Sequence, residues 1–464
     1  MKKIQMIEKI LNNWRGFPNT SVAGHYEFLS QTVCANSLER RDILALNDNR
    51  NDIRIKRKVY GIFIHEITHW LDHTSTLWGQ KFLIDIYNAF NAKENEIIEE
   101  LWRIQQLFSD LSRINFADYY TVNGSGAKKA WNKQPWKYEF GSGLQFGSDG
   151  KIRETHPFLY TKFYNIDGEF VKRVPLSVVS LLETNAVASE LWLEKVLSHL
   201  LHPEELIIEK NLIEQNYLER LYNPELTVYS VAAHCLANLA GITDAADAYQ
   251  RASALSTLCL NLPSQVFHLL KIPSDVQERI GDRANHMVNL QDRGVAFFLI
   301  ANYAEKDNHL DILEWLESAI FSAGLPPINE LEELAVQEMD ELNKQMLKDP
   351  HIEKFMELAR GVGASEAIED NFISHYTYFK NLLKVGKENF LKRGIYGNHI
   401  ICLESLLNKD DNCLKLPPIL LGDDEIIQLG NEAIEQPWQG LEEWIYYVWS
   451  IEDKLKEFNR ACFI

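Results

Sequence analysis

The chain of 464 residues contains few cysteines, glycines and prolines, and each scarcity excludes a class of protein. Its six cysteines are scattered and form no C-x-x-C pair, so we expect reduced thiols rather than a disulfide framework or a cysteine-based metal site. Glycine (23) and proline (14) are too sparse for a collagen-like or low-complexity chain. Because 46% of the residues are hydrophobic, the chain can bury a sizeable core.

Long apolar runs and an excess of positive charge are also absent. No uninterrupted apolar run approaches the ~18–20 residues of a membrane-spanning helix. Glu8 and Lys9 interrupt the N-terminal segment where a signal peptide would need its apolar core. The formal net charge of −19, without a basic stripe interleaved with aromatic residues, disfavours nucleic acid. We therefore expect a cytoplasmic protein that binds neither membrane nor nucleic acid.

Helical periodicity dominates the rest of the sequence and predicts a mainly α fold with a small β portion (α+β). Residues 115–175 differ, because they hold glycine clusters and many aromatic residues. Within them, Asp167-Gly168 predicts the turn of a hairpin that pairs 158–164 with 170–174. From residue 176 onward the pattern is almost wholly helical, punctuated by prolines.

The most informative motif is His65-Glu66-Ile67-Thr68-His69. Residues four apart on a helix lie one above the other, roughly 6 Å apart, so the two imidazoles can bind one cation. Glu66 is turned away from that axis, where it can hold a water on the open side of the metal, as in H-E-x-x-H peptidases. Apolar residues on both sides of the motif predict a buried helix.

A catalytic zinc ion needs three protein ligands and one open position, so the two histidines require a partner. His73 lies four residues beyond His69. His65 and His73 are roughly 12 Å apart along an unbroken helix, too far for both to bind an ion that His69 also binds. The third ligand is therefore expected outside this segment.

Glu183 is the preferred third ligand. It lies on a helix predicted over 177–200, and a carboxylate flanked by Leu182 and Ala186 requires a partner when it is buried. The small residues near Glu183 are Thr184, Ala186, Ala188 and Ser189. They allow this helix to pack closely against the motif helix, which brings the carboxylate within reach of the metal. Glu190, two turns later on the same face, is the alternative third ligand.

These two segments resemble the gluzincin group of zinc metallopeptidases, whose members pair H-E-x-x-H with a glutamate on a later helix, often within E-x-x-A. The residues that carry the resemblance are His65, Glu66, His69, Glu183 and Ala186. The first segment, followed by Asp72, is also locally similar to the neprilysin-like enzymes. The resemblance implies one Zn²⁺ bound by His65, His69 and Glu183, with Glu66 as the catalytic base.

The same resemblance implies a domain organisation. We expect a zincin-like metallopeptidase domain over residues 1–205, with an insertion at about 75–175 that lies over or beside the cleft. A large helical domain would follow over 206–464, divided into two subdomains near residue 326.

The implied function is that of a zinc-dependent endopeptidase, which hydrolyses peptide bonds of a protein substrate through a zinc-bound water activated by Glu66. An extended substrate would pair with an edge strand, which we predict at 42–46. A side chain that stabilises the oxyanion is expected too. The candidates are Tyr160, Tyr164, His156, His234 and His375.

The helical half of the chain leaves a second function open. A helical interaction or regulatory protein could carry a zincin site that is structural or inactive. The aromatic residues that favour this alternative are Trp438, Trp444, Tyr446, Tyr447 and Trp449. The intact Glu66 favours the enzyme, because a purely structural metal site needs no base. A regulatory protein partner would suit either function.

Overall fold

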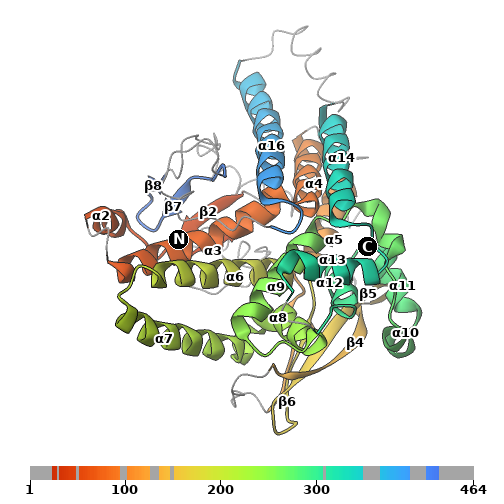
Figure 1. Ribbon diagram of the computed structural model, residues 1–464. Coiled ribbons are helices and arrows are strands. Elements are labelled where there is room, and N and C mark those ends of the chain that lie inside the picture. The colour runs from red at the N-terminus through yellow and green to blue at the C-terminus, as the bar shows by residue number, and fades with distance from the viewer. Residues whose placement is uncertain are drawn as a thin grey trace.

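A computed structural model of the chain describes residues 23–28, 31–48, 52–94, 102–125, 135–146, 151–306, 310–347, 366–397 and 414–427. These residues form many helices and two small sheets (Figure 1). The predicted class, mainly α with a small β portion, is therefore confirmed.

The motif lies on α3 (Ile53–Ser75), near the centre of the molecule. The helix begins at Asp52, whose carboxylate accepts hydrogen bonds from the backbone N–H groups of Arg54 and Ile55. Every residue from Glu66 to Ser75 is buried, so this part of the helix is covered on all sides. The predicted burial of the motif helix is confirmed.

Helices from both halves of the chain pack against α3. The predicted helix at 177–200 is α6 (Val178–Ser198), which begins with a capping box between Ser177 and Ser180 and packs along α3 (Figure 1). The other face of α6 packs against α8 (Thr227–Ala240) and α9 (Ala245–Leu260). From the C-terminal part of the chain, α16 (Glu366–Arg393) packs against α3 as well.

A small sheet lies beside α3 and joins distant parts of the chain. Its strands are β1 (His25–Glu27), β2 (Thr32–Ala35), β7 (Ile419–Leu421) and β8 (Ile426–Ile427), in that order. The central pair, β2 and β7, is parallel, and the two outer pairs are antiparallel. The C-terminal segment thus completes a sheet that begins before the motif helix.

The strand predicted at 42–46 is wrong, because these residues belong to the helix α2 (Arg40–Asp48). Ile43 and Leu46 are three residues apart and both pack into the core, which is helical rather than alternating spacing. The carboxylate of Asp42 accepts a hydrogen bond from Lys58 on α3 at 2.6 Å and so ties the two helices together. A run of five residues is too short to distinguish the two periods.

The second sheet has the order β3-β6-β5-β4 and is antiparallel throughout. Its strands are β3 (Val122–Asn123), β4 (Lys137–Phe146), β5 (Ile152–Tyr164) and β6 (Phe170–Pro175). The predicted hairpin is confirmed as β5 and β6, which pair Phe163 with Lys172. Gly168 adopts a φ of +79° in the turn, a conformation that favours glycine.

The remaining helices cover these elements. They are α4 (Leu77–Glu94), α5 (Trp102–Ile114), α7 (Pro203–Leu221), α10 (Ser274–Ile280), α11 (Asp282–Asn289), α12 (Arg293–Ala301), α13 (Ile312–Ser322) and α14 (Ile328–Leu347). Short 3-10 turns lie at Asp118–Tyr120, Pro224–Leu226 and Ser264–Leu269. None of the helices in the described residues combines the length and the apolar composition that a membrane-spanning helix requires. Two consecutive helical segments with a bend between them, Pro224–Ala240 and Ala245–Leu260, reach that length and composition only when they are taken together.

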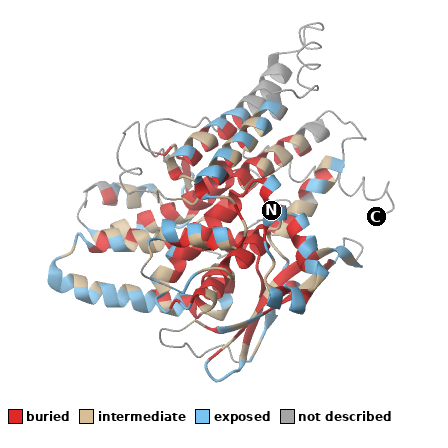
Figure 2. Cartoon of the chain, turned by 45° about the vertical axis from the view of Figure 1, so that its right-hand side comes forward, coloured by how far each residue is buried: buried red, intermediate tan, exposed pale blue. Residues whose placement is uncertain are grey.

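The buried apolar side chains form one cluster that runs from Tyr26 to Leu421 (Figure 2). This cluster includes residues on both sides of positions 205 and 326. The domain boundaries at these positions, and the zincin-like nature of the first domain, stay predictions.

Candidate metal centre

His65, His69 and Glu183 meet at one point between α3 and α6. The two histidine Nε2 atoms are 3.2 Å apart, and Glu183 Oε2 lies 3.5 Å from each of them. Two atoms bound to zinc at about 2.0–2.1 Å, at a tetrahedral angle, are separated by about 3.3 Å. The side chains predicted from the sequence as metal ligands are therefore brought together with the spacing that a zinc ion requires.

The carboxylate of Glu183 supports the same interpretation. Its side chain is only 1% exposed, and Oε2 accepts no hydrogen bond from the part of the chain that the structure describes, although both imidazoles lie nearby. Burial alone would raise the pKa of Glu183, but His69 and His65 hold it below its ordinary value. A buried, ionised carboxylate oxygen needs a cationic partner. A metal ion between the three side chains would supply one.

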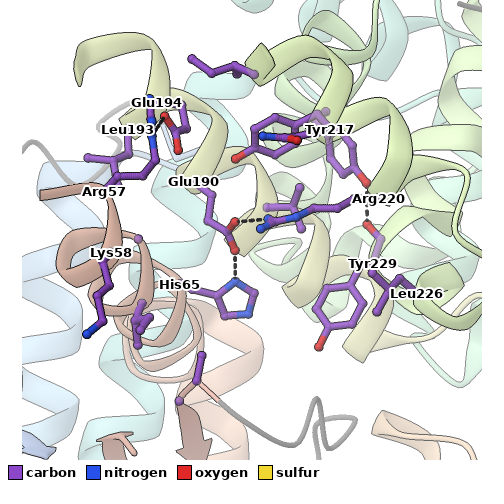
Figure 3. A pocket seen from close by; sticks show the side chains of 18 of the residues that line it. Arg57, Lys58, His65, Glu190, Leu193, Glu194, Tyr217, Arg220, Leu226 and Tyr229 are labelled. Carbon is purple, nitrogen blue, oxygen red and sulfur yellow. Dashed lines mark hydrogen bonds and ion pairs between the residues drawn. The ribbon is translucent and has the colours of Figure 1, made fainter. Parts of the chain in front are cut away.

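Glu190 contacts His65 on the opposite ring nitrogen. Its Oε1 lies 2.6 Å from His65 Nδ1, and its Oε2 accepts a hydrogen bond from Arg220 Nη1 at 2.6 Å (Figure 3). Burial alone would raise the pKa of Glu190, but His65 and Arg220 lower it, so the carboxylate is ionised and can only accept. The alternative ligand from the sequence therefore lies outside the three-atom cluster.

His65 is held between two carboxylates. Burial opposes the charged form of its imidazole, yet Glu183 and Glu190 raise the pKa of His65 well above its ordinary value. With the Nδ1 proton directed to Glu190, Nε2 is the atom that faces His69 and Glu183. This is the orientation that metal binding through Nε2 requires.

His73 lies in a separate aromatic cluster. Its Nδ1 is 2.6 Å from the hydroxyl of Tyr26, and its ring stacks on Phe28 with the centroids 4.1 Å apart. Burial lowers the pKa of His73 to about 3, so the imidazole is neutral. This position agrees with the distance argument that excluded His73 as a ligand.

Glu66 is 7% exposed and lines a cavity next to His65. Burial raises the pKa of its carboxyl group above the ordinary value, although His65 and His69 counteract the rise. The backbone before β1 approaches this side chain closely, because a Cβ on Gly24 would come within 3.0 Å of Glu66 Cγ. Glu66 is thus enclosed on one side and faces the cavity on the other.

The cavity has a volume of about 540 Å³ and lies between α3, α6 and α7, with α8 and α9 at one end. Figure 3 shows His65 and Glu190 at its inner wall, with Arg57 and Glu194 at one side and Tyr229 at the other. Much of the lining is apolar. The apolar residues that form it are Ala23, Ile62, Val187, Leu193, Leu212, Ile213 and Leu226. A molecule bound in this cavity would therefore lie beside His65 and Glu66.

Asp72 joins three helices behind the ligands. Its side chain is fully buried, and its two oxygens accept hydrogen bonds from Arg393 Nη2 on α16 at 2.9 Å and from Asn185 Nδ2 on α6 at 2.7 Å. Ser253 on α9 donates to Asn185 Oδ1 at 2.9 Å. This network holds α6, and with it Glu183, in place against α3.

Four of the five side chains expected to stabilise an oxyanion lie outside the cavity. Tyr160, Tyr164 and His156 are on β5, and none of them lines the cavity. His234 stacks on Trp136 with ring centroids 4.8 Å apart. The side chain of His375 lies outside the described residues, as do the aromatic residues from Trp438 to Trp449.

The polar residues of the cavity that the sequence did not predict include Tyr229 and Arg220. The ring of Tyr229, on α8, lies 6.2 Å from the ring of His65. The side chain of Arg220, on α7, is 56% exposed and lies over the ring of Tyr217. No local motif marks either residue, so only the packing of α7 and α8 against α6 places them at the site.

Comparisons with models of known protein families, with curated proteins and with solved structures find no match. The resemblance to gluzincins therefore rests on the motif residues of the sequence.

Proposed function

We propose that the chain is a zinc-dependent endopeptidase that acts on a protein or peptide substrate. The observation that carries the proposal is the convergence of His65 Nε2, His69 Nε2 and Glu183 Oε2 beside a cavity that Glu66 also lines. Three ligands with an open side are typical of a catalytic rather than a structural zinc site. A base on that open side is what hydrolysis requires.

His65, His69 and Glu183 are the residues that would hold the ion. When bound, zinc would polarise the carbonyl of the scissile bond and make a water molecule more acidic. Two histidine nitrogens and one carboxylate are a donor set found in catalytic zinc sites. The ionised state of Glu183 supports this fit, because a ligating carboxylate must be deprotonated.

Glu66 is the general base of the proposed reaction. Its carboxylate would accept a proton from the attacking water and then donate that proton to the leaving amine. The raised pKa of Glu66 supports this role, because a base with a pKa nearer to neutrality can both accept and return a proton.

Substrate would lie along the cavity. Ala23 and Gly24, just before β1, line it, so an extended peptide would run beside this segment rather than beside 42–46. Tyr229 is the candidate for stabilising the oxyanion, because it is the cavity tyrosine whose ring lies within 6.2 Å of His65. The cytoplasm is the proposed location, supported by the buried free thiols of Cys235 and Cys259.

The substitution Glu66→Gln tests the proposal. The amide is nearly isosteric but cannot accept the proton, so cleavage should fall by a factor on the order of 10² or more. Zinc content and thermal melting should match the wild type. The assay is mass spectrometry of a broad peptide library incubated with each zinc-loaded protein. Retained cleavage by Glu66→Gln would contradict the proposed role of Glu66, and wild type that cleaves nothing would contradict the proposed activity.

A further inference from the structure

Glu190 and Arg220 connect the wall of the cavity to a metal ligand. We infer that Glu190 is a positioning residue that fixes His65 for metal binding, and that Arg220 supports it from α7. The inference rests on the proposed metal site and goes beyond it, because it assigns roles to two residues that bind no metal.

The two oxygens of Glu190 are divided between the two partners. Oε1 accepts from His65 Nδ1 and Oε2 accepts from Arg220 Nη1, each at 2.6 Å (Figure 3). Both are short, charge-assisted hydrogen bonds, which are stronger than those between neutral groups. Since Arg220 occupies the second oxygen, the carboxylate cannot rotate away from His65 without losing this bond. The imidazole is therefore held with Nε2 toward Glu183.

The spacing on α6 brings one carboxylate of this helix near each ring nitrogen of His65. Glu183 and Glu190 are seven residues apart and lie on the same face, two turns from each other. Glu183 lies near Nε2, and Glu190 reaches Nδ1 of the same ring. The side chains of His65 and Glu190 are only 16% and 18% exposed, so water has little access to their contact. A histidine bound to a metal commonly donates its other N–H to a carboxylate in this way.

α7 is largely exposed, and Tyr217 and Leu221 are its only buried residues. Two ion pairs join it to the helices of the site: Arg220 with Glu190 on α6, and Glu209 with Arg57 on α3 at 3.2 Å. In the first pair, Glu190 also contacts the proposed metal ligand His65; in the second pair, neither residue contacts a proposed ligand. Any change in α7 that withdraws Arg220 is therefore transmitted to His65 through Glu190.

The test is the zinc dissociation constant, measured by competition with a chromophoric chelator at constant pH. Glu190→Ala should weaken zinc binding by about 10- to 100-fold, the range for residues that orient metal ligands. Arg220→Met should weaken it less, by about 3- to 10-fold, because Glu190 still accepts from His65. Arg220→Lys, which keeps the charge, should recover most of the loss. The double variant should bind zinc no more weakly than Glu190→Ala alone, because Arg220 acts through Glu190.

Arg279→Met is the matched control. Arg279 is also partly exposed and pairs with a glutamate, Glu139, at 3.3 Å, but it lies on α10 and does not line the cavity. This variant should bind zinc as the wild type does. Circular dichroism of each variant checks that the fold is retained. Glu190→Met, which keeps the length of the side chain but has only a weak acceptor, replaces Glu190→Ala if the latter unfolds.

Proton NMR of the metal-free protein separates the inference from the proposed function. The Nδ1 proton of His65 should give a slowly exchanging, downfield resonance in wild type that disappears in Glu190→Ala. Additive losses in the double variant, or zinc binding by Glu190→Ala within twofold of wild type, would overturn the inference. Wild type that binds no zinc would contradict the metal site itself, and the NMR resonance would then decide whether Glu190 holds His65.

Discussion

Replacing Arg393 by methionine should lower the free energy of unfolding by about 3–5 kcal/mol, the usual cost of leaving one partner of a buried ion pair alone. The guanidinium donates to Asp72 Oδ1 at 2.9 Å and to Ser75 Oγ at 3.0 Å. Asp72 is fully buried and Arg393 is only 10% exposed, so water cannot replace the lost contacts. Asn185 would then be the donor left to Asp72.

The magnitude follows from what remains after the substitution. Methionine fills most of the space of the arginine stem, so the main loss is electrostatic rather than a cavity. Asp72 keeps the hydrogen bond from the uncharged amide of Asn185 but loses the one from the charged guanidinium. A hydrogen bond to a charged group contributes about 1.5–3 kcal/mol, and a buried charge without a counter-charge costs more. Adding Asp72→Asn removes the charge, so the double variant should be less destabilised than Arg393→Met alone.

Urea unfolding followed by circular dichroism and fluorescence measures the effect. The control is Arg40→Met, because Arg40 also pairs with the C-terminal segment, at Glu425 and 3.0 Å, but is 65% exposed. That variant should change the free energy of unfolding by less than about 1 kcal/mol. Equal effects of the two substitutions would refute the reasoning that burial determines the cost.

Three further outcomes are expected. Burial and the neighbouring carboxylate of Asp110 raise the pKa of Asp85 to about 7, so the stability that Asp85 contributes is present below its unfolded pKa of 3.8 and is lost as the pH rises through 7. Asp85→Asn should therefore raise the melting temperature more at pH 8 than at pH 5, and equal gains at the two pH values would contradict this. Gly24→Ala should lower the melting temperature, since its Cβ would lie 2.8 Å from the backbone oxygen of Cys34, and an unchanged melting curve would show that the strand can shift freely. Tyr229→Phe should reduce kcat by roughly 10²-fold with zinc content unchanged, as steady-state kinetics would measure, and full activity would move the oxyanion role elsewhere.

The sequence was sufficient to predict the motif helix, α3, and the helix that carries Glu183, α6. The spacing of His65 and His69 places two imidazoles on one face of any regular helix, and a lone carboxylate at Glu183 in an apolar segment needs a cationic partner. Sequence spacing did not separate Glu183 from Glu190, because both lie on the same face of α6. The way in which α6 is aligned along α3 decides which carboxylate approaches Nε2 of His65 and which approaches Nδ1.

Contacts between distant segments could not be predicted. Arg393 reaches Asp72 across 321 positions of the chain, and no local pattern marks either residue as half of a pair. Strand β7 pairs with β2 although the two are separated by most of the chain. The error at 42–46 has a local cause, since a short apolar run fits a strand and a helix equally well and only packing against α3 distinguishes them.

The central claim is that His65, His69 and Glu183 bind one zinc ion, and elemental analysis of the purified chain tests it most directly. Wild type should carry or take up about one zinc per chain. His69→Ala and Glu183→Ala should each lower the occupancy sharply, because each removes one of three ligands, whereas His73→Ala should leave it unchanged. Wild type that takes up no zinc on titration, or zinc uptake that survives both ligand substitutions, would contradict the account.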